Sequence, residues 1–364
     1  MAGAITQRRV TLAGTALVLV GLVLAVQAFD AGAVVDTLAG ADRGLLALAV
    51  AVYAASWPLR GRRYADVLAA MEHRTDTYFL TLTVFASQTA NLAIPARAGD
   101  AVRAQLVRAR RDVPYATGFA SLAVERAFDL VTVAALAAGS AVALVAVDGT
   151  TPWMLAGETA GGTRALRIGA VVGIGAVVAA LVGVALARSD LRVGKTLRET
   201  AASQSILDRA LDAGGRFLDA VAVVARRPRS MAAIGVWSAL LWAADVATAV
   251  LVLAAVGVGA DAGLLVVAGT LAVSVGNLAK VLPLSQGGIG LYEAAFTAIL
   301  VGLTPIGAGV ALAAAVADHA LKNAVTLVGG AVAVVSLNVS LTDAAAADST
   351  ARSTPTDREP ESAD

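Results

Sequence analysis

Long apolar runs separated by short polar segments dominate the chain. Six of these runs are long enough, or nearly so, to cross the roughly 30 Å of hydrocarbon in a bilayer. They are residues 10–29, 44–59, 113–147, 165–187, 231–258 and 306–339. Because helices are the usual way for such runs to satisfy their backbone groups in lipid, the pattern predicts an all-α, polytopic transmembrane helical bundle with six crossings.

Two further apolar stretches are interrupted by proline and glycine. Residues 77–96 lead into the sequence PARAGD at 95–100, and residues 263–282 lead into PLSQGGIG at 283–290. Proline and glycine interrupt transmembrane helices. Each stretch is therefore compatible with a full span or with a re-entrant hairpin.

The placement of basic residues favours re-entrant hairpins. Lysine and arginine accumulate in cytoplasmic loops. Most basic residues lie in four segments, 8–9, 60–76, 97–112 and 188–229. Both flanks of 77–96 are thus predicted to be cytoplasmic, and we expect a hairpin that turns near Pro95–Gly99 and returns along 100–111. By the same reasoning, residues 263–303 enter from the outside.

We expect one flippase-like transmembrane domain over residues 1–341, with halves of about 1–150 and 160–341. Both termini are predicted to be cytoplasmic in a multi-pass protein of the cell membrane. Residues 188–229 resemble an amphipathic cytoplasmic connector. The acidic tail at 342–364 has no periodicity and is expected to be disordered.

Composition excludes several classes of functional site and partner. The chain is 58% hydrophobic and only 15% charged, and its net charge of +1 gives no reason to expect a nucleic-acid partner. Cysteine is absent, which excludes disulfides, thiolate zinc sites, iron–sulfur clusters and cysteine nucleophiles. The two histidines, His73 and His319, are too few for a histidine-rich metal site. We expect no metal and no cofactor.

The two interrupted stretches resemble each other. Residues 87–100 read SQTANLAIPARAGD and residues 274–293 read SVGNLAKVLPLSQGGIGLYE. Both contain Ser, Asn-Leu-Ala, Pro, a glycine-containing turn and an acidic residue, although chance similarity in an Ala- and Val-rich chain is an alternative. Three crossings in each half would invert the second half relative to the first. Inverted repeats with broken helices are typical of transporters.

Ionisable residues inside the apolar runs are the candidate functional groups. Glu125 and Asp129 are four residues apart and share a helix face, and Asp318 and Lys322 have the spacing of an ion pair. An unpaired charge costs about 2.5 to 3.5 kcal/mol at a helix centre. We therefore expect a polar cavity between the halves that is lined with cations and carboxylates.

The two carboxylates at 125 and 129 need cations from elsewhere, with Arg97, Arg103 and Arg126 as the nearest candidates. Glycines after Pro283 favour an unwound turn that receives an anion. The predicted substrate-binding residues are Arg97, Asp100, Arg103, Glu125, Arg126, Asp129, Gly287, Gly288, Gly290, Glu293, Asp318, His319 and Lys322.

Each candidate has a structural alternative. Arg97 and Arg103 could extend to the cytoplasmic headgroups as topology determinants. Arg126 with the two carboxylates could be an ion-pair cluster that fixes helix register. His319 could be a buried, hydrogen-bonded histidine, and the glycines at 287–290 could serve packing alone.

Three segments resemble the transmembrane, flippase-like region of the lysylphosphatidylglycerol synthase family. They are NLAIPARAGDAVRAQLV at 91–107, LAVERAFDLV at 122–131 and LPLSQGGIGLYEAAFTAIL at 282–300. The resemblance covers nearly the whole chain apart from the tail. It implies an integral membrane protein that moves an amphipathic lipid between leaflets, such as an aminoacylated phosphatidylglycerol or a polyprenyl-linked sugar. Gln286 stands where relatives usually carry proline, and no soluble aminoacyl-transfer domain follows residue 341, so we expect no synthase activity.

Three functions remain open, with membrane lipids as the expected partners. The first is a lipid flippase or scramblase for an anionic lipid, because the planar guanidinium of arginine binds phosphate in a bidentate manner. The second is a membrane-embedded lipid-phosphate transferase. The third is a non-transporting partner of a lipid-modifying enzyme or glycosyltransferase, docked through residues 188–229. We expect the first, and hence a protein that is not an enzyme.

Overall fold

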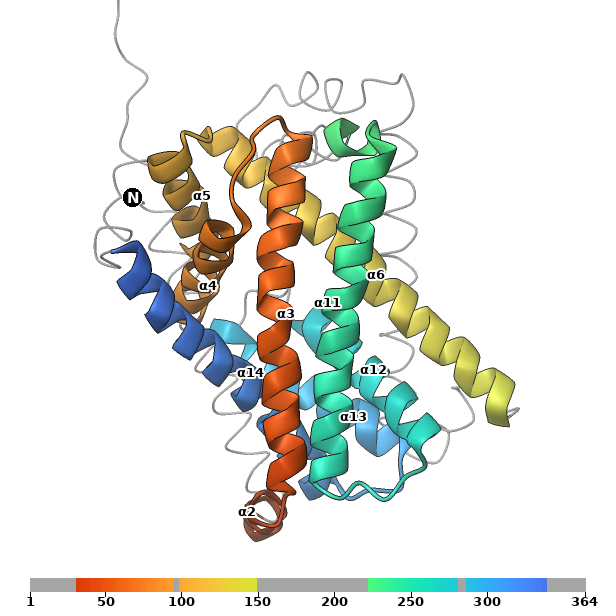
Figure 1. Ribbon diagram of the computed structural model, residues 1–364. Coiled ribbons are helices and arrows are strands. Elements are labelled where there is room, and N and C mark those ends of the chain that lie inside the picture. Colours follow the sequence, from red (N-terminus) through yellow and green to blue (C-terminus); the bar gives the residue numbers. More distant parts are fainter. Residues whose placement is uncertain (1–30, 94–97, 149–221, 281–285, 339–364) are drawn as a thin grey trace, which may run out of the picture.

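The computed structural model describes residues 31–93, 98–148, 222–280 and 286–338, and within these ranges the chain is helical without strands (Figure 1). The helices are α2 (Ala31–Ala39), α3 (Arg43–Ala70), α4 (Thr77–Ala93), α5 (Ala98–Arg111), α6 (Tyr115–Asp148), α11 (Pro228–Ala255), α12 (Ala262–Ala279), the short 3₁₀-helix η1 (Gln286–Gly288), α13 (Leu291–Leu303) and α14 (Ala308–Leu337). The predicted all-α class is confirmed for this part of the chain.

Two long antiparallel helices, α3 and α11, form the scaffold. At one end the backbone N–H of Asp42 donates to the carbonyl of Ala255 at 2.8 Å. At the other end Arg227 pairs with Glu72 at 2.8 Å. Figure 1 shows the two helices side by side along their length. The carboxylate of Asp42 also caps α3 by accepting hydrogen bonds from two N–H groups of its first turn.

Helix α3 is longer than the sequence pattern predicts. The expected crossing at 44–59 continues through Pro58 to Ala70, so residues 60–70 of the basic segment at 60–76 are helical. A proline inside a helix removes one backbone hydrogen bond. Trp57 and Tyr64, which are almost completely buried on either side of the proline, provide packing that offsets this cost.

Helices α4 and α5 form an antiparallel hairpin, as the sequence predicts for this region. The N–H of Gly99 donates to Oδ1 of Asn91 at 2.9 Å, and Nε of Arg103 donates to Oγ of Ser87 at 3.4 Å. A Cβ atom at Gly99 would lie 1.9 Å from the Ser87 carbonyl oxygen, so the two helices approach each other closely only because residue 99 is glycine. Entry of this hairpin from the cytoplasm stays a prediction.

Helices α12 and α13, joined through η1, form a second antiparallel pair. Gly276 of α12 packs against the ring of Tyr292 in α13, and the side chain of Lys280 lies against Gly288. α12 is long and apolar enough to cross a membrane by itself. A re-entrant path for residues 263–303 therefore stays a prediction as well.

The two hairpins occupy opposite ends of the bundle. The α4–α5 hairpin lies beside the C-terminal half of α3, and α12 and α13 lie beside the C-terminal half of α11 (Figure 1). Their tips meet, since Gly287 of η1 lies against Leu92 at the end of α4. Helix α14 crosses both, with Gly330 packed against Thr89 of α4. Small residues at such contacts let transmembrane helices approach closely.

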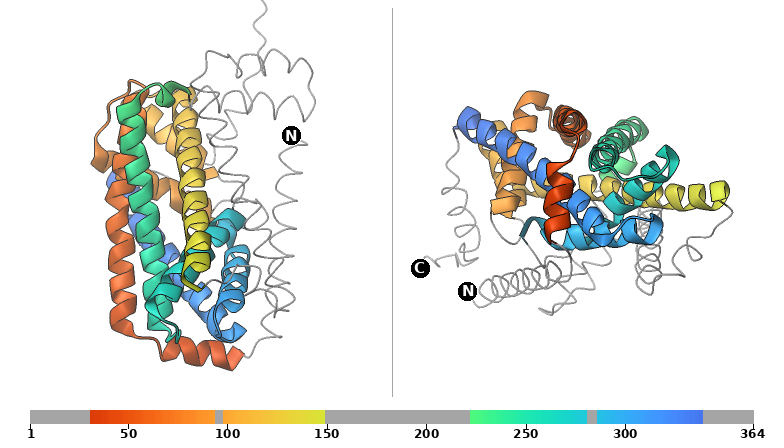
Figure 2. Two further views of the ribbon diagram at one scale, coloured as in Figure 1. Left: turned by 90° about the vertical axis from the view of Figure 1, so that its right-hand side faces the viewer. Right: turned by 90° about the horizontal axis from the view of Figure 1, so that it is seen from below.

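Four helices in the described part of the chain, α3, α11, α12 and α14, can cross a membrane by length and composition. Helix α6 matches the predicted crossing at 113–147, and its C-terminal end projects from the bundle (Figure 2). The chain is thus a multi-pass helical protein, while six crossings and an inverted repeat stay predictions. The crossings at 10–29 and 165–187, most of the connector at 188–229 and the tail at 342–364 lie outside the described residues.

Candidate functional site

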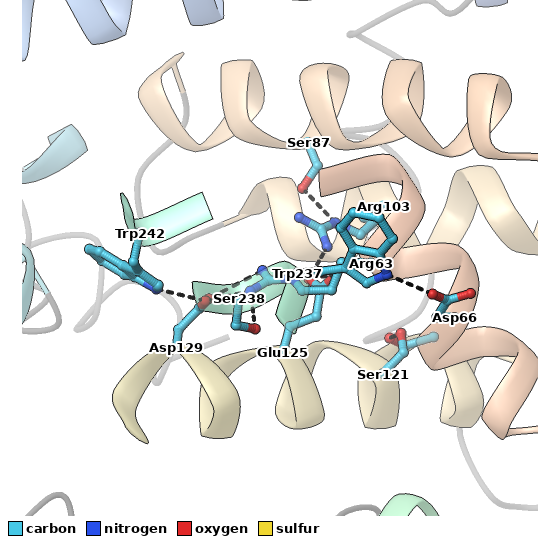
Figure 3. A network of polar contacts seen from close by, with 11 residues as sticks. Arg63, Asp66, Ser87, Arg103, Ser121, Glu125, Asp129, Trp237, Ser238 and Trp242 are labelled. Carbon is cyan, nitrogen blue, oxygen red and sulfur yellow. Dashed lines mark hydrogen bonds and ion pairs between the residues drawn. The ribbon is translucent and has the colours of Figure 1, made fainter. Parts of the chain in front are cut away.

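Four charged residues from three helices form a buried network that we name the arginine cluster (Figure 3): Arg63 of α3, Arg103 of α5, and Glu125 and Asp129 of α6. Nη1 of Arg103 lies 2.5 Å from Oε2 of Glu125, and Nη1 of Arg63 lies 2.5 Å from Oδ1 of Asp129. Nε of Arg63 is also 3.9 Å from Oε1 of Glu125. Asp129 is partly buried and the other three are buried, so these pairs lie away from solvent.

Hydroxyl and indole groups complete the arginine cluster. Ser238 of α11 accepts a hydrogen bond from Nη1 of Arg63 at 3.0 Å. Nε1 of Trp242 donates to Oδ1 of Asp129 at 3.1 Å. Each charge in the cluster therefore has at least one partner of opposite sign and most have a second polar contact. Removing one member of such a buried set leaves an uncompensated charge, which is strongly destabilising.

A second network, the lysine cluster, joins α11, α13 and α14. Nζ of Lys322 lies 3.1 Å from Oδ2 of Asp245 and 3.0 Å from Oδ2 of Asp318. The hydroxyl of Tyr292 donates to Oδ2 of Asp318 at 2.5 Å. All four residues are buried. Asp245 lies about 10 Å further along α11 than Ser238, so the lysine cluster lies closer to the C-terminal end of α11 than the arginine cluster.

Glu293 and His319 extend the lysine cluster toward the broken helix. Oε1 of Glu293 lies 2.6 Å from Nδ1 of His319, and Oε2 accepts a hydrogen bond from the N–H of Gly290 at 2.6 Å. Both side chains are buried. The second contact caps α13 at its first turn. His319 is therefore a buried, hydrogen-bonded histidine, and Glu293 fixes the start of α13.

The predicted unwound turn after α12 is present. Gly287, Gly288 and Gly290 have φ values of 65°, 77° and 83°. This is the left-handed region, which side chains with a Cβ atom rarely adopt. These glycines therefore favour the break between α12 and α13, and Gln286 begins the 3₁₀ turn.

The remaining predicted residues have other partners. Nη2 of Arg126 lies 3.5 Å from Oδ1 of Asp100, and its side chain is 41% exposed. Of the candidate cations for the two carboxylates, Arg103 pairs with Glu125. Arg126 pairs with Asp100 and interacts with Asp129 only at longer range. Arg97, the third expected cation, lies outside the described residues.

The structure thus divides the predicted candidates between two clusters. The first half contributes Arg103, Glu125 and Asp129 to the arginine cluster, with the Asp100–Arg126 pair nearby. The second half contributes the lysine cluster and the turn before α13. In the described part of the chain, no group of three or more His, Asp or Glu side chains is arranged to hold a metal ion.

The predicted site residues do not include two arginines, Asp245 and a tyrosine. Arg60 and Arg63 follow an apolar run, and they were indistinguishable by position from the basic flank of a cytoplasmic loop. Tyr292 belongs to a segment already noted for its glycines. The signal that could have identified Arg63 is the helical spacing of Ser56, Arg60 and Arg63, which are four and then three residues apart and share one face of a helix that continues past Pro58.

Comparison with known proteins is consistent with this architecture. The chain matches a curated relative, "Glycosyltransferase AglD" of Haloferax volcanii, with 45% identity over 371 residues that cover 99% of this chain. The chain spans 59% of that relative's length. The relative bears the name of an enzyme, which contradicts the expectation that this chain is not an enzyme. Residues 11–330 match the lysylphosphatidylglycerol synthase TM region, and the chain belongs to that family of membrane proteins.

Proposed function

We propose that this chain binds the anionic headgroup of a lipid-linked sugar inside its helical bundle and moves it between the two leaflets. The observation that carries the proposal is the meeting of buried charges from α3, α5, α6, α11, α13 and α14 in two clusters. A bundle made largely of Ala, Val and Leu could fold with apolar residues in place of these ion pairs. Well-packed apolar residues often replace a buried ion pair at no loss of stability.

The arrangement of the hairpins supports the transport part of the proposal. The α4–α5 and α12–α13 hairpins lie at opposite ends of the bundle and their tips are in contact. We propose that they are re-entrant elements of an inverted repeat that enter from opposite leaflets. A headgroup could then pass from one hairpin to the other past the two clusters, while its lipid tails remain in the bilayer.

The relative's name supports a sugar-bearing lipid over an aminoacylated phospholipid. A glycosyltransferase that works at a membrane needs a lipid-linked donor or acceptor within reach. The same lipid-linked sugar can be moved across the membrane and used in glycosyl transfer. The proposal therefore concerns the transport step and leaves a catalytic step open.

A reconstituted flipping assay tests the proposal. The purified protein is placed in unilamellar vesicles with a trace of fluorescent polyprenyl-phosphate sugar, and an impermeant quencher reports the lipid in the outer leaflet. Lys322→Met removes the cation shared by Asp245 and Asp318, and Arg111→Gln removes an ion pair at the bundle end as the matched control. We expect rapid flipping by the wild type and the control and slow flipping by Lys322→Met.

Vesicles with wild-type protein that flip the lipid no faster than protein-free vesicles would refute the proposal. Flipping by a Lys322→Met variant at the wild-type rate would refute the role of the lysine cluster. Thermal melting of each variant in detergent shows whether it is folded before reconstitution.

The relative's name favours a second candidate, participation of this chain in the glycosyl-transfer reaction itself. The test is incubation of the purified chain with a nucleotide sugar and a polyprenyl phosphate. Formation of the lipid-linked sugar would support this candidate, and its absence over a range of nucleotide sugars would count against it.

A further inference from the structure

Arg60, which is partly buried, differs from the buried cations of the two clusters. Arg63, Arg103 and Lys322 each lie within 4 Å of a carboxylate. Among the residues that the structure describes, no carboxylate lies at ion-pair distance from Arg60. Its guanidinium carbon instead lies 5.3 Å from the centre of the Trp57 ring and 5.6 Å from that of Tyr53.

Two hydrogen-bond donors at this position have no acceptor. Nε of Arg60 and Nε1 of Trp57 are both buried without a hydrogen-bond partner among the described residues, although Trp57 is only 2% exposed. They are three residues apart on α3, so they lie on neighbouring turns of one helix face. Buried donors in proteins are nearly always paired, because an unpaired donor loses its hydrogen bonds to water and gains none within the protein. Two unpaired donors on neighbouring turns of α3 therefore indicate a place for an acceptor.

The surroundings hold these donors in place. The Trp57 ring stacks on Phe85 of α4 with centroids 3.6 Å apart and an angle of 6° between the planes. Tyr53 lies edge-on to Trp57 at 6.3 Å, and it interacts electrostatically with Arg60, Asp245 and Lys322. The Arg60 site thus adjoins the lysine cluster. Asp245 interacts electrostatically with Arg60, but its ion pair is with Lys322, at 3.1 Å.

We propose that Arg60 and Nε1 of Trp57 bind a phosphate oxyanion within the bundle. A guanidinium presents several N–H donors in one plane and matches the oxygens of a phosphate, with the indole N–H as a further donor. That the phosphate is carried by a lipid rests on the proposed function; the site itself is derived from the unpaired donors. The arginine cluster, whose charges already neutralise one another, then positions the helices, and Arg60 contacts the headgroup.

Binding measurements separate this inference from transport. The full chain in nanodiscs is titrated with radiolabelled polyprenyl phosphate, with the uncharged polyprenol and with inorganic phosphate. Arg60→Gln removes the charge, Arg60→Lys keeps the charge but loses the planar fork, and Trp57→Phe keeps the stack on Phe85 but removes the indole N–H. Arg62→Gln on the same helix is the matched control, because its side chain is 54% exposed and pairs with Asp66.

We expect the wild type and Arg62→Gln to bind polyprenyl phosphate equally. Arg60→Gln should weaken binding by about tenfold to a hundredfold, the range for a hydrogen bond to a charged group, and Trp57→Phe by about two- to tenfold. Arg60→Lys should lie between the wild type and Arg60→Gln. Polyprenol should bind weakly to all variants.

Equal affinity of the wild type and Arg60→Gln for polyprenyl phosphate would overturn the inference, and so would equal affinity of the wild type for polyprenyl phosphate and polyprenol. Binding of inorganic phosphate that depends on Arg60, without binding of the lipid, would keep the oxyanion site and exclude a lipid as its source. Flipping that fails while Arg60-dependent binding persists would refute the proposed transport but not this site. Melting temperatures of the four variants confirm that each is folded.

Discussion

The arginine cluster predicts a large and specific loss of stability when Glu125 is neutralised. Glu125 is 6% exposed, lies 2.5 Å from Arg103 and is the second carboxylate near Arg63. Glu125→Gln keeps the shape of the side chain but leaves the charge of Arg103 buried without a carboxylate. Loss of one partner of a buried pair costs about 3 to 5 kcal/mol.

The control is Glu72→Gln. Glu72 pairs with Arg227 at 2.8 Å, but its side chain is 79% exposed. Exposed ion pairs contribute about 0 to 1 kcal/mol. The two substitutions are chemically identical, so the difference between them isolates the effect of burial.

Reversible unfolding in mixed micelles of increasing SDS content measures the free energy of unfolding of each variant. The double variant Glu125→Leu with Arg103→Leu removes both charges of the pair and leaves Arg63 with Asp129. We expect it to recover most of the loss, because two apolar side chains replace the ion pair. The reasoning is refuted if Glu125→Gln loses no more stability than Glu72→Gln, or if the double variant is less stable than Glu125→Gln.

Three further predictions concern the hairpins and their ends. Gly330→Val should lower the free energy of unfolding by about 1 to 3 kcal/mol through overpacking, because a Cβ atom at Gly330 would lie 1.9 Å from Oγ1 of Thr89. An unchanged free energy of unfolding in SDS would contradict this close approach of α14 and α4. Gly288→Ala should cost about 1 to 2 kcal/mol at a φ of 77°, measured in the same way, and no loss would mean that the turn relaxes. A hydrogen bond from Arg111 holds the pKa of Asp76 below its usual 3.8, so the ion pair stabilises the protein at neutral pH and this contribution is lost as the pH falls through the lowered pKa. Melting temperatures should therefore show Asp76→Asn slightly less stable than the wild type at pH 7 and equal to it in strong acid. A difference in melting temperature that does not depend on pH would contradict the ion pair.

The helical class and the two interrupted segments were predictable because they depend on residue types and spacings within single segments of the chain. The unwound turn depends on the glycines at 287, 288 and 290, whose positive φ values are rarely adopted by residues with a Cβ atom, so the residue type alone indicates it. The ion pair of Asp318 with Lys322 followed from a spacing of four residues in one helix. These features need no knowledge of the tertiary fold.

The partners that come from distant parts of the chain were not predictable in this way. Asp129 pairs with Arg63, 66 residues away, and Lys322 pairs with Asp245, 77 residues away. Nothing local distinguishes Arg63 from a basic residue at the end of a membrane span, because both follow an apolar run. The helix continues past Pro58 only because Trp57 and Tyr64 find tertiary packing, which a single sequence does not reveal.

The central claim is that the charged interior of the bundle receives the headgroup of a lipid. The most direct test is an experimental structure of the full chain in nanodiscs that contain polyprenyl phosphate. We expect phosphate density between α3 and α14, within hydrogen-bond distance of the Arg60 guanidinium. Lipid phosphate found only around the outer surface of the bundle, with the donors of Arg60 and Trp57 paired to protein groups, would contradict it.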